Sequence, residues 1–175
     1  MTNEPATAAW AELEAIRVLK HQYLRFLDCK CFDDLGQLLT DDVRSSYDSG
    51  KMSHVGRAAV VQFLSEALSD PAVVTMHTAH HPEIALISDT TASGTWYLED
   101  RVIVAEQDFE LHGTAIYRDE YRKHEGRWLI SSTGYVRIFE EGRRRSSGQV
   151  LAWRTMFDEA DADAADPVRR PDVGG

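Results

Sequence analysis

The chain has 175 residues, of which 43% are hydrophobic and 27% charged, a balance typical of one globular domain with a sizeable core. Its formal net charge of −10 argues against nonspecific binding to nucleic acid or anionic membranes, because both need a basic surface. No apolar run approaches the roughly 20 residues of a membrane span, and the first residues lack the features of a secretion signal. Cys29 and Cys31 are too close for an ordinary disulfide, so we expect a cytoplasmic protein with reduced thiols.

The first third of the chain is predicted to be helical. Apolar residues recur there at three- and four-residue steps, which places them on one face of a helix of about five turns. A short helix over residues 32–39, a strand over 43–47, a turn over 48–51 and a helix over 57–68 follow. The apolar stripe of the first helix comprises Trp10, Leu13, Ile16, Leu19, Tyr23, Phe26 and Leu27.

From residue 73 the pattern changes to long runs of alternating polar and apolar residues. Four strands are expected over residues 73–87, 91–105, 109–123 and 127–140, and their short polar connections indicate hairpins in an antiparallel meander. Helices followed by a curved antiparallel or mixed sheet predict an α+β domain, with a pocket between the helices and the concave sheet face. We expect a partly helical extension over residues 143–160 and a disordered tail over 161–175.

Asp100 is the most informative residue of these strands. Every second residue from Trp96 gives Trp96, Leu98, Asp100, Val102 and Val104, which puts one carboxylate in the middle of an apolar strand face. An unpaired buried carboxylate is unfavourable, so Asp100 is expected to have a partner, to be protonated, or to lie in a cavity built for a reaction. A structural ion pair would account for the same pattern.

Three histidines, His77, His80 and His81, lie close together before Pro82. They lack the spacing of the metalloprotease zinc motif, and we expect no metal here. Because an ordinary histidine titrates near neutral pH, it can take a proton and return it. We therefore predict that His77 is an acid–base catalyst, and that His80 and His81 lie at a strand end.

Three further polar residues are candidates. Tyr23 and Asp28 are five residues apart near the end of the first helix, about 140° apart around an ideal helix, so they would meet only if the helix unwinds at Asp28. A core tyrosine and a surface carboxylate at a helix end are the structural alternatives. Arg137, between Tyr135 and Phe139, is either an exposed cation or a pocket residue that holds a substrate oxygen.

Five segments together resemble a known family. They are residues 23–28, 76–80, 82–84, 95–101 and 133–138, and the strings WYLEDR and TGYVRI within them are the most specific. They are similar to the SnoaL-like branch of the NTF2-like cone-fold superfamily, and most similar to its bacterial bile-acid 7-alpha-dehydratases, over residues 12–141. The resemblance implies a cone-shaped SnoaL-like domain over residues 8–142, catalysis without a cofactor, and a homotrimer. By position, it assigns the catalytic roles to Tyr23, Asp28, His77, Asp100 and Arg137.

The reaction implied is elimination of water from a hydroxylated 3-oxo-4-ene steroid or a similar hydrophobic substrate, free or as a coenzyme A thioester. It needs a base, an acid for the leaving hydroxyl and donors for a developing oxyanion. We assign the acid–base role to His77, which Asp28 orients, and the binding of a substrate oxygen to Tyr23. Asp100 is assigned a second acid–base or polarising role. Arg137 either binds a substrate oxygen or pairs with Asp100. A ketosteroid-isomerase-like or polyketide-cyclase-like enzyme and a noncatalytic ligand-binding domain remain alternatives, because one fold can host all of these.

Overall fold

The computed structural model of the chain describes residues 4–145, so the predicted C-terminal extension and tail lie almost wholly outside the described residues. Its α-helices are α1 (Glu4–Asp28), α2 (Phe32–Gly36) and α3 (Arg57–Leu68). Its strands are β1 (Leu39–Tyr47), β2 (Met52–Val55), β3 (Val73–Leu86), β4 (Thr91–Val104), β5 (Phe109–His124) and β6 (Arg127–Arg144). Single 3-10 turns, η1 (Asp48–Gly50) and η2 (Ala105–Gln107), follow β1 and β4. Among these residues, no helix combines the length and apolar character needed to cross a membrane.

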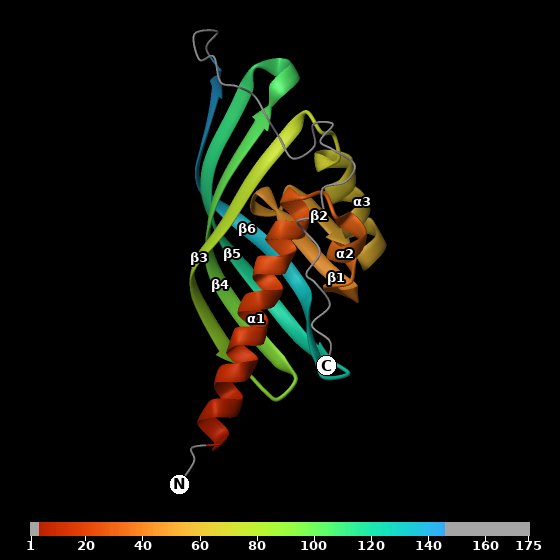
Figure 1. Cartoon of the computed structure of the whole chain (residues 1–175), viewed down its shortest axis with the longest axis vertical. Helices are drawn as coiled ribbons and strands as arrows, with labels where there is room; N and C mark the ends of the chain where they lie inside the picture. The colour runs from red at the N-terminus through yellow and green to blue at the C-terminus, as the bar shows by residue number, and fades with distance from the viewer. Residues whose placement is uncertain (1–3, 146–175) are drawn as a thin grey trace, which may run out of the picture.

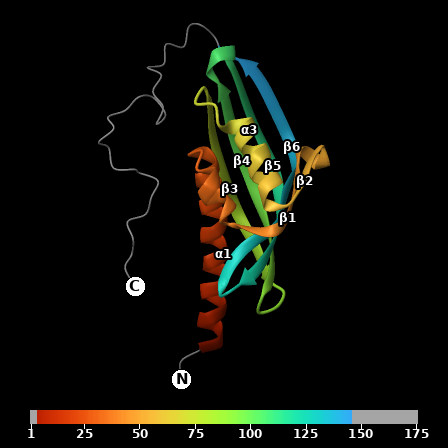
Figure 2. The ribbon, with the colours of Figure 1, turned by 90° about the vertical axis from the view of Figure 1, so that its right-hand side faces the viewer.

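The strands form one curved sheet in the order β2-β1-β6-β5-β4-β3. The predicted meander of β3 to β6 is confirmed, since each of these strands pairs antiparallel with the next. β1 pairs parallel with β6 and antiparallel with β2, which makes the sheet mixed. The helices lie on its concave face, and no helix within residues 4–145 covers the opposite face (Figures 1 and 2). The predicted α+β fold, with a curved mixed sheet and N-terminal helices, is therefore confirmed.

The core lies between α1 and the concave face of the sheet. Ile16, Leu19, Tyr23 and Leu27 from α1 are buried against it, as the apolar stripe predicts. Trp10 is an exception, because 64% of its surface is exposed. The first turns of α1 run out past the body of the fold (Figure 1), so this end of the stripe has little to pack against.

Several boundaries differ from the sequence-based expectation. The helix expected over 32–39 ends at Gly36, and β1 starts at Leu39 rather than at residue 43. β2 escaped prediction because it is short, largely exposed and paired with β1 alone, so burial leaves little pattern in it. The expected strand end at His80–His81 is wrong: β3 continues to Leu86 through a bulge between His80 and Glu83.

Candidate active site

Asp28 and His77 form a close pair where α1 meets β3. The Asp28 Oδ1 atom lies 2.6 Å from Nδ1 of His77, and the backbone N–H of His77 donates to Oδ2 at 2.9 Å. The Thr75 hydroxyl donates to the same carboxylate at 2.7 Å, so three bonds fix its orientation. A carboxylate at Nδ1 holds the ring proton there and leaves Nε2 of His77 as the nitrogen able to accept another. The predicted contact between these two residues is present.

Asp100 and Arg137 form a second pair on the sheet. The guanidinium donates twice, from Nη1 to Oδ1 at 2.5 Å and from Nη2 to Oδ2 at 2.7 Å, a two-pronged geometry that fits a carboxylate. The Asp100 side chain is 3% exposed, so the expectation of a buried carboxylate with a partner is confirmed. Asp100 is thus a salt-bridged anion rather than an isolated acid in an apolar strand face.

Gly113 makes room for this second pair. It lies directly opposite Asp100 on the neighbouring strand, and a Cβ atom there would lie 2.7 Å from Nη1 of Arg137 and 3.1 Å from Oδ1 of Asp100. A bulge in β6 leaves Ile138 without a partner between the Arg137–Ala115 and Phe139–Thr114 pairings. The glycine and the bulge together bring a long cation across the concave face to a carboxylate two strands away.

The strand register relates the two pairs to each other. His77 on β3 is directly opposite Asp100 on β4, so both side chains leave the sheet on the same face. Four of the five predicted residues therefore meet as two neighbouring pairs: a carboxylate with an imidazole, and a carboxylate with a guanidinium. Such a constellation supplies a proton acceptor beside a fixed cation.

Tyr23, the fifth predicted residue, has a different partner. α1 stays helical to Asp28 without unwinding, and Tyr23 and Asp28 contact different strands. The fully buried Tyr23 hydroxyl lies 2.7 Å from the hydroxyl of Tyr47 on β1. Burial raises the pKa of Tyr23 well above its ordinary value and raises that of Tyr47 as well, so both remain neutral donors at physiological pH.

The sequence reading missed a group of tyrosines that links Tyr23 to Arg137. The ring of Tyr135 lies 5.7 Å from that of Tyr47 and 5.4 Å from that of Tyr117, and the Arg137 guanidinium lies 4.8 Å from the centre of the Tyr135 ring. Tyr117 and Tyr135 are opposite each other on β5 and β6. Their side chains lie on the same face as Asp100, which alternation along β5 and β6 could have indicated.

A buried ion pair at the other end of the core was also missed. Nζ of Lys20 lies 2.8 Å from Oδ2 of Asp119, and both side chains are 0% exposed. The hydroxyls of Tyr121 and Thr133 donate to the same carboxylate at 2.9 and 2.8 Å. Burial lowers the pKa of the Lys20 ammonium, while the charge of Asp119 acts in the opposite direction.

Other histidines lie on the outer face of the sheet. His80 and His112 contact the Glu99 carboxylate at 3.7 and 3.2 Å. Across residues 4–145, no three His, Cys, Asp or Glu side chains come together as metal ligands would. Catalysis without a metal or cofactor stays a prediction.

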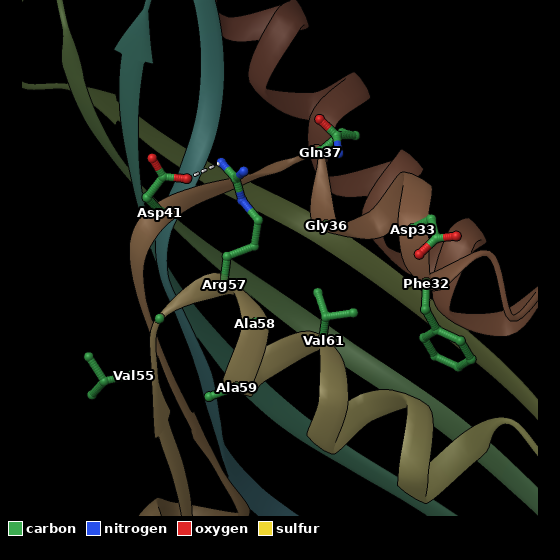
Figure 3. A pocket seen from close by; sticks show the side chains of 11 residues that line it. Phe32, Asp33, Gly36, Gln37, Asp41, Val55, Arg57, Ala58, Ala59 and Val61 are labelled. Carbon is green, nitrogen blue, oxygen red and sulfur yellow. Dashed lines mark ion pairs between the residues drawn. The ribbon is translucent and has the colours of Figure 1, made fainter.

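An open groove of about 620 Å³ lies away from these pairs, between α2 and the start of α3 (Figure 3). Arg57 lies in it, donates to the carbonyl oxygen of Leu39 at 2.7 Å and forms an ion pair with Asp41 at 2.9 Å. None of the five predicted residues lines this groove. That all five line one common pocket stays a prediction.

The fold and the paired acid–base residues together define a small α+β protein of the cone-fold class. A family model for the SnoaL-like domain matches residues 8–134, so the chain belongs to the SnoaL-like family.

Solved structures of similar fold include a candidate scytalone dehydratase from Novosphingobium aromaticivorans, with 18% identity over 83% of this chain and 99% of that one and a TM-score of 0.72. A type 2 hexachlorocyclohexane dehydrochlorinase (LinA) has 16% identity over 82% and 97% of the two chains and a TM-score of 0.71. ActVI-ORFA from Streptomyces coelicolor has 15% identity over 73% and 98%, with a TM-score of 0.63. At these identities the likeness establishes the fold alone.

Proposed function

We propose that the protein is a cofactor-independent dehydratase, a carbon–oxygen lyase acting on a hydroxylated 3-oxo-4-ene steroid or a similar hydrophobic substrate. The observation that carries the proposal is the 2.6 Å contact between Asp28 and His77, directly beside the Asp100–Arg137 pair. This arrangement couples a proton acceptor to a fixed cation and contains no activated nucleophile. Membership of the SnoaL-like family supports it, and two structures of similar fold are named for eliminations, a dehydratase and a dehydrochlorinase.

The residues divide the reaction between them. In a 3-oxo-4-ene steroid the conjugated carbonyl acidifies the proton at carbon 6, and Nε2 of His77 takes it while Nδ1 keeps its bond to Asp28. The electron pair moves toward the 3-oxo oxygen and gives a dienolate, which is stabilised by the hydroxyl of Tyr23 or its partner Tyr47. When the electron pair returns, the bond from carbon 7 to its hydroxyl breaks. The hydroxide leaves with the proton from carbon 6 as water, and a dienone remains.

Asp100 and Arg137 act as one unit in this scheme. The carboxylate holds the guanidinium by two bonds, and Glu140 adds a third contact at 3.1 Å from Nε. An arginine held by two bonds to one carboxylate is ready to bind a substrate oxygen without first losing side-chain freedom. The role of Asp100 is thus to position the cation and to bring negative charge near His77.

The proposal includes a homotrimer that acts in the cytoplasm. No helix within residues 4–145 covers the convex sheet face (Figure 2), which carries exposed apolar side chains, and copies of the same chain are the proposed occupants. Light scattering at micromolar concentration is expected to give three times the monomer mass, and a monomer would contradict this part of the proposal. The apolar side chains concerned are Met76, Tyr97, Val136, Ile138 and Phe139.

The enzyme activity is tested with a panel of hydroxylated 3-oxo-4-ene steroids, free and as coenzyme A thioesters. Formation of the dienone is followed by its red-shifted absorbance, and mass analysis separates loss of water from an isomer of unchanged mass. His77→Ala is expected to lower turnover by roughly 100- to 10,000-fold, the range of general acid–base catalysis, and Asp28→Asn by less. His124→Ala, at the exposed end of β5, is the matched control and should keep full turnover. Equal activity per folded molecule in His77→Ala would remove the proposed mechanism.

A further inference from the structure

Tyr117 is a buried tyrosine whose hydroxyl has no hydrogen-bond partner among residues 4–145. Its side chain lies on the concave face of β5, opposite Trp96 on one side and Tyr135 on the other, and the residue is 2% exposed. Across residues 4–145 its hydroxyl makes no hydrogen bond, whereas those of Tyr23, Tyr47 and Tyr121 each do. Yet its oxygen is not among the polar atoms that are both unpaired and fully enclosed. The hydroxyl therefore keeps a small accessible surface and is free to donate to a group from outside the described residues.

The Tyr117 ring belongs to the group of tyrosines beside Arg137. The Tyr117 ring meets the Tyr135 ring edge to face at 5.4 Å, and Tyr135 in turn lies under the Arg137 guanidinium. Burial raises the pKa of Tyr117, and the negative charges of Asp119 and Asp100 raise it further. The hydroxyl is thus a neutral donor that faces the same interior as Tyr47 and the Asp100–Arg137 pair.

A buried cation lies over the ring of Tyr117. Nζ of Lys20 lies 3.4 Å from the centre of the Tyr117 ring, closer than to the Tyr23 ring at 5.2 Å. Apart from its contact with Asp119, this ammonium has no oxygen acceptor within the described part of the chain, so its other protons face aromatic rings. A cation on a ring face draws electron density from the ring, and in a dry interior this effect is strong. It makes the phenol hydroxyl a better donor to an anionic oxygen.

We propose that Tyr117 is a further substrate-binding residue whose hydroxyl donates to an oxygen that becomes negatively charged, and that buried Lys20 is a positioning residue that strengthens this donor through the ring. The inference rests on the proposed function and adds a substrate class to it: a planar conjugated ketone or enol whose oxygen reaches the tyrosine group. Asp119 completes the device, because it holds the ammonium against the ring.

Binding of 2-naphthol tests the proposal without requiring turnover. Its phenolate mimics a dienolate oxygen on a planar ring system, and its fluorescence distinguishes the neutral from the ionised form. Tyr117→Phe is expected to weaken binding of the phenolate about 100-fold, the usual effect of removing one oxyanion donor. Tyr97→Phe is the matched control: it removes the same hydroxyl group from a tyrosine that is 45% exposed on the outer face of β4, away from Tyr117. It should bind within a few-fold of the unmodified protein.

The role of Lys20 is tested by Lys20→Met/Asp119→Asn, which removes both buried charges, because Lys20→Met alone leaves Asp119 unpaired and endangers folding. The double variant should lose about tenfold in phenolate affinity, the size of a desolvated cation–π contact, and this loss should vanish in a Tyr117→Phe background. An equal loss of phenolate affinity in both backgrounds would show that Lys20 has only a structural role. The proposal would be overturned if Tyr117→Phe bound the phenolate as tightly as the unmodified protein, or if the unmodified protein did not bind it. Tyr117-dependent binding without steroid turnover would keep this inference and refute the proposed substrate.

Discussion

Replacing Gly113 by alanine perturbs the Asp100–Arg137 pair without removing either charge. The new methyl group would lie 2.7 Å from Nη1 of Arg137, about 0.7 Å short of the 3.4 Å at which ordinary contact begins, and 3.2 Å from the carbonyl oxygen of Phe139. Overpacking of this kind costs about 1–3 kcal/mol, and replacing a strand glycine returns about 0.5–1 kcal/mol. The expected net loss of stability is therefore roughly 0.5–2 kcal/mol.

Turnover should suffer more than stability in Gly113→Ala. A misplacement approaching 1 Å in a catalytic group lowers the rate by up to about 100-fold, so a loss of roughly 10- to 100-fold is expected. Gly142→Ala on β6 is the control, because its methyl would press on the Phe109 ring at 2.9 Å and leave the ion pair alone. Denaturant unfolding and turnover are measured on both variants. The same loss of turnover per folded molecule in the two variants, or no loss in Gly113→Ala, would refute the reasoning.

Three further predictions concern stability. Lys30→Met should lower the free energy of unfolding by about 1–3 kcal/mol, because the ammonium donates to the carbonyl oxygens of Leu68 at the end of α3 and Val73 at the start of β3. Denaturant unfolding measures this loss, and a loss of only about a few tenths of a kcal/mol would contradict the prediction. The bonds from Arg101 lower the pKa of Glu110 to about 2, so its stabilisation is complete above the unfolded value near 4.5 and is lost as pH falls toward 2. Glu110→Gln should reduce the dependence of the melting temperature on pH over that window. An unchanged dependence would contradict the stabilising role of Glu110. Burial raises the pKa values of Tyr23 and Tyr47, so their contribution to the free energy of unfolding is complete below about pH 10 and is lost as pH rises further. In an alkaline titration, phenolate absorbance should therefore rise together with the loss of circular dichroism. Ionisation of these tyrosines while the protein is still folded would refute the prediction.

The sequence was sufficient for the features that depend on alternation. The position of Asp100 between apolar neighbours predicted a buried carboxylate in need of a partner, and the structure supplies Arg137. The meander of β3 to β6 followed from long alternating runs with short connections. In both cases the burial of one sheet face produces alternating apolar and polar residues, and this alternation can be recognised from the sequence alone.

The buried ion pair of Lys20 and Asp119 also left a signal of burial in the sequence. Asp119 alternates with Tyr117 and Tyr121 as Asp100 does with Leu98, and Lys20 lies on the buried face of α1 four residues after Ile16. Each therefore carried a signal of burial, but nothing in the sequence joins a lysine to an aspartate 99 positions later. The Tyr23–Tyr47 bond is of this kind as well, because helix and strand meet only through the packing of the whole domain.

The position of β6 in the sheet sets the order in which the fold can be completed. β6 is the last described strand in the chain, but it lies between β1 and β5 and joins the two halves of the sheet. Leu39 on β1 is opposite Ile130 on β6, so this join closes a loop of about 90 residues. Until β6 is made, β1 and β2 have no strand pairing with the meander, and β1 and β5 each leave a bare edge in the growing chain. Folding during synthesis therefore ends with insertion of a central strand, and contacts so distant in sequence make that final step slow.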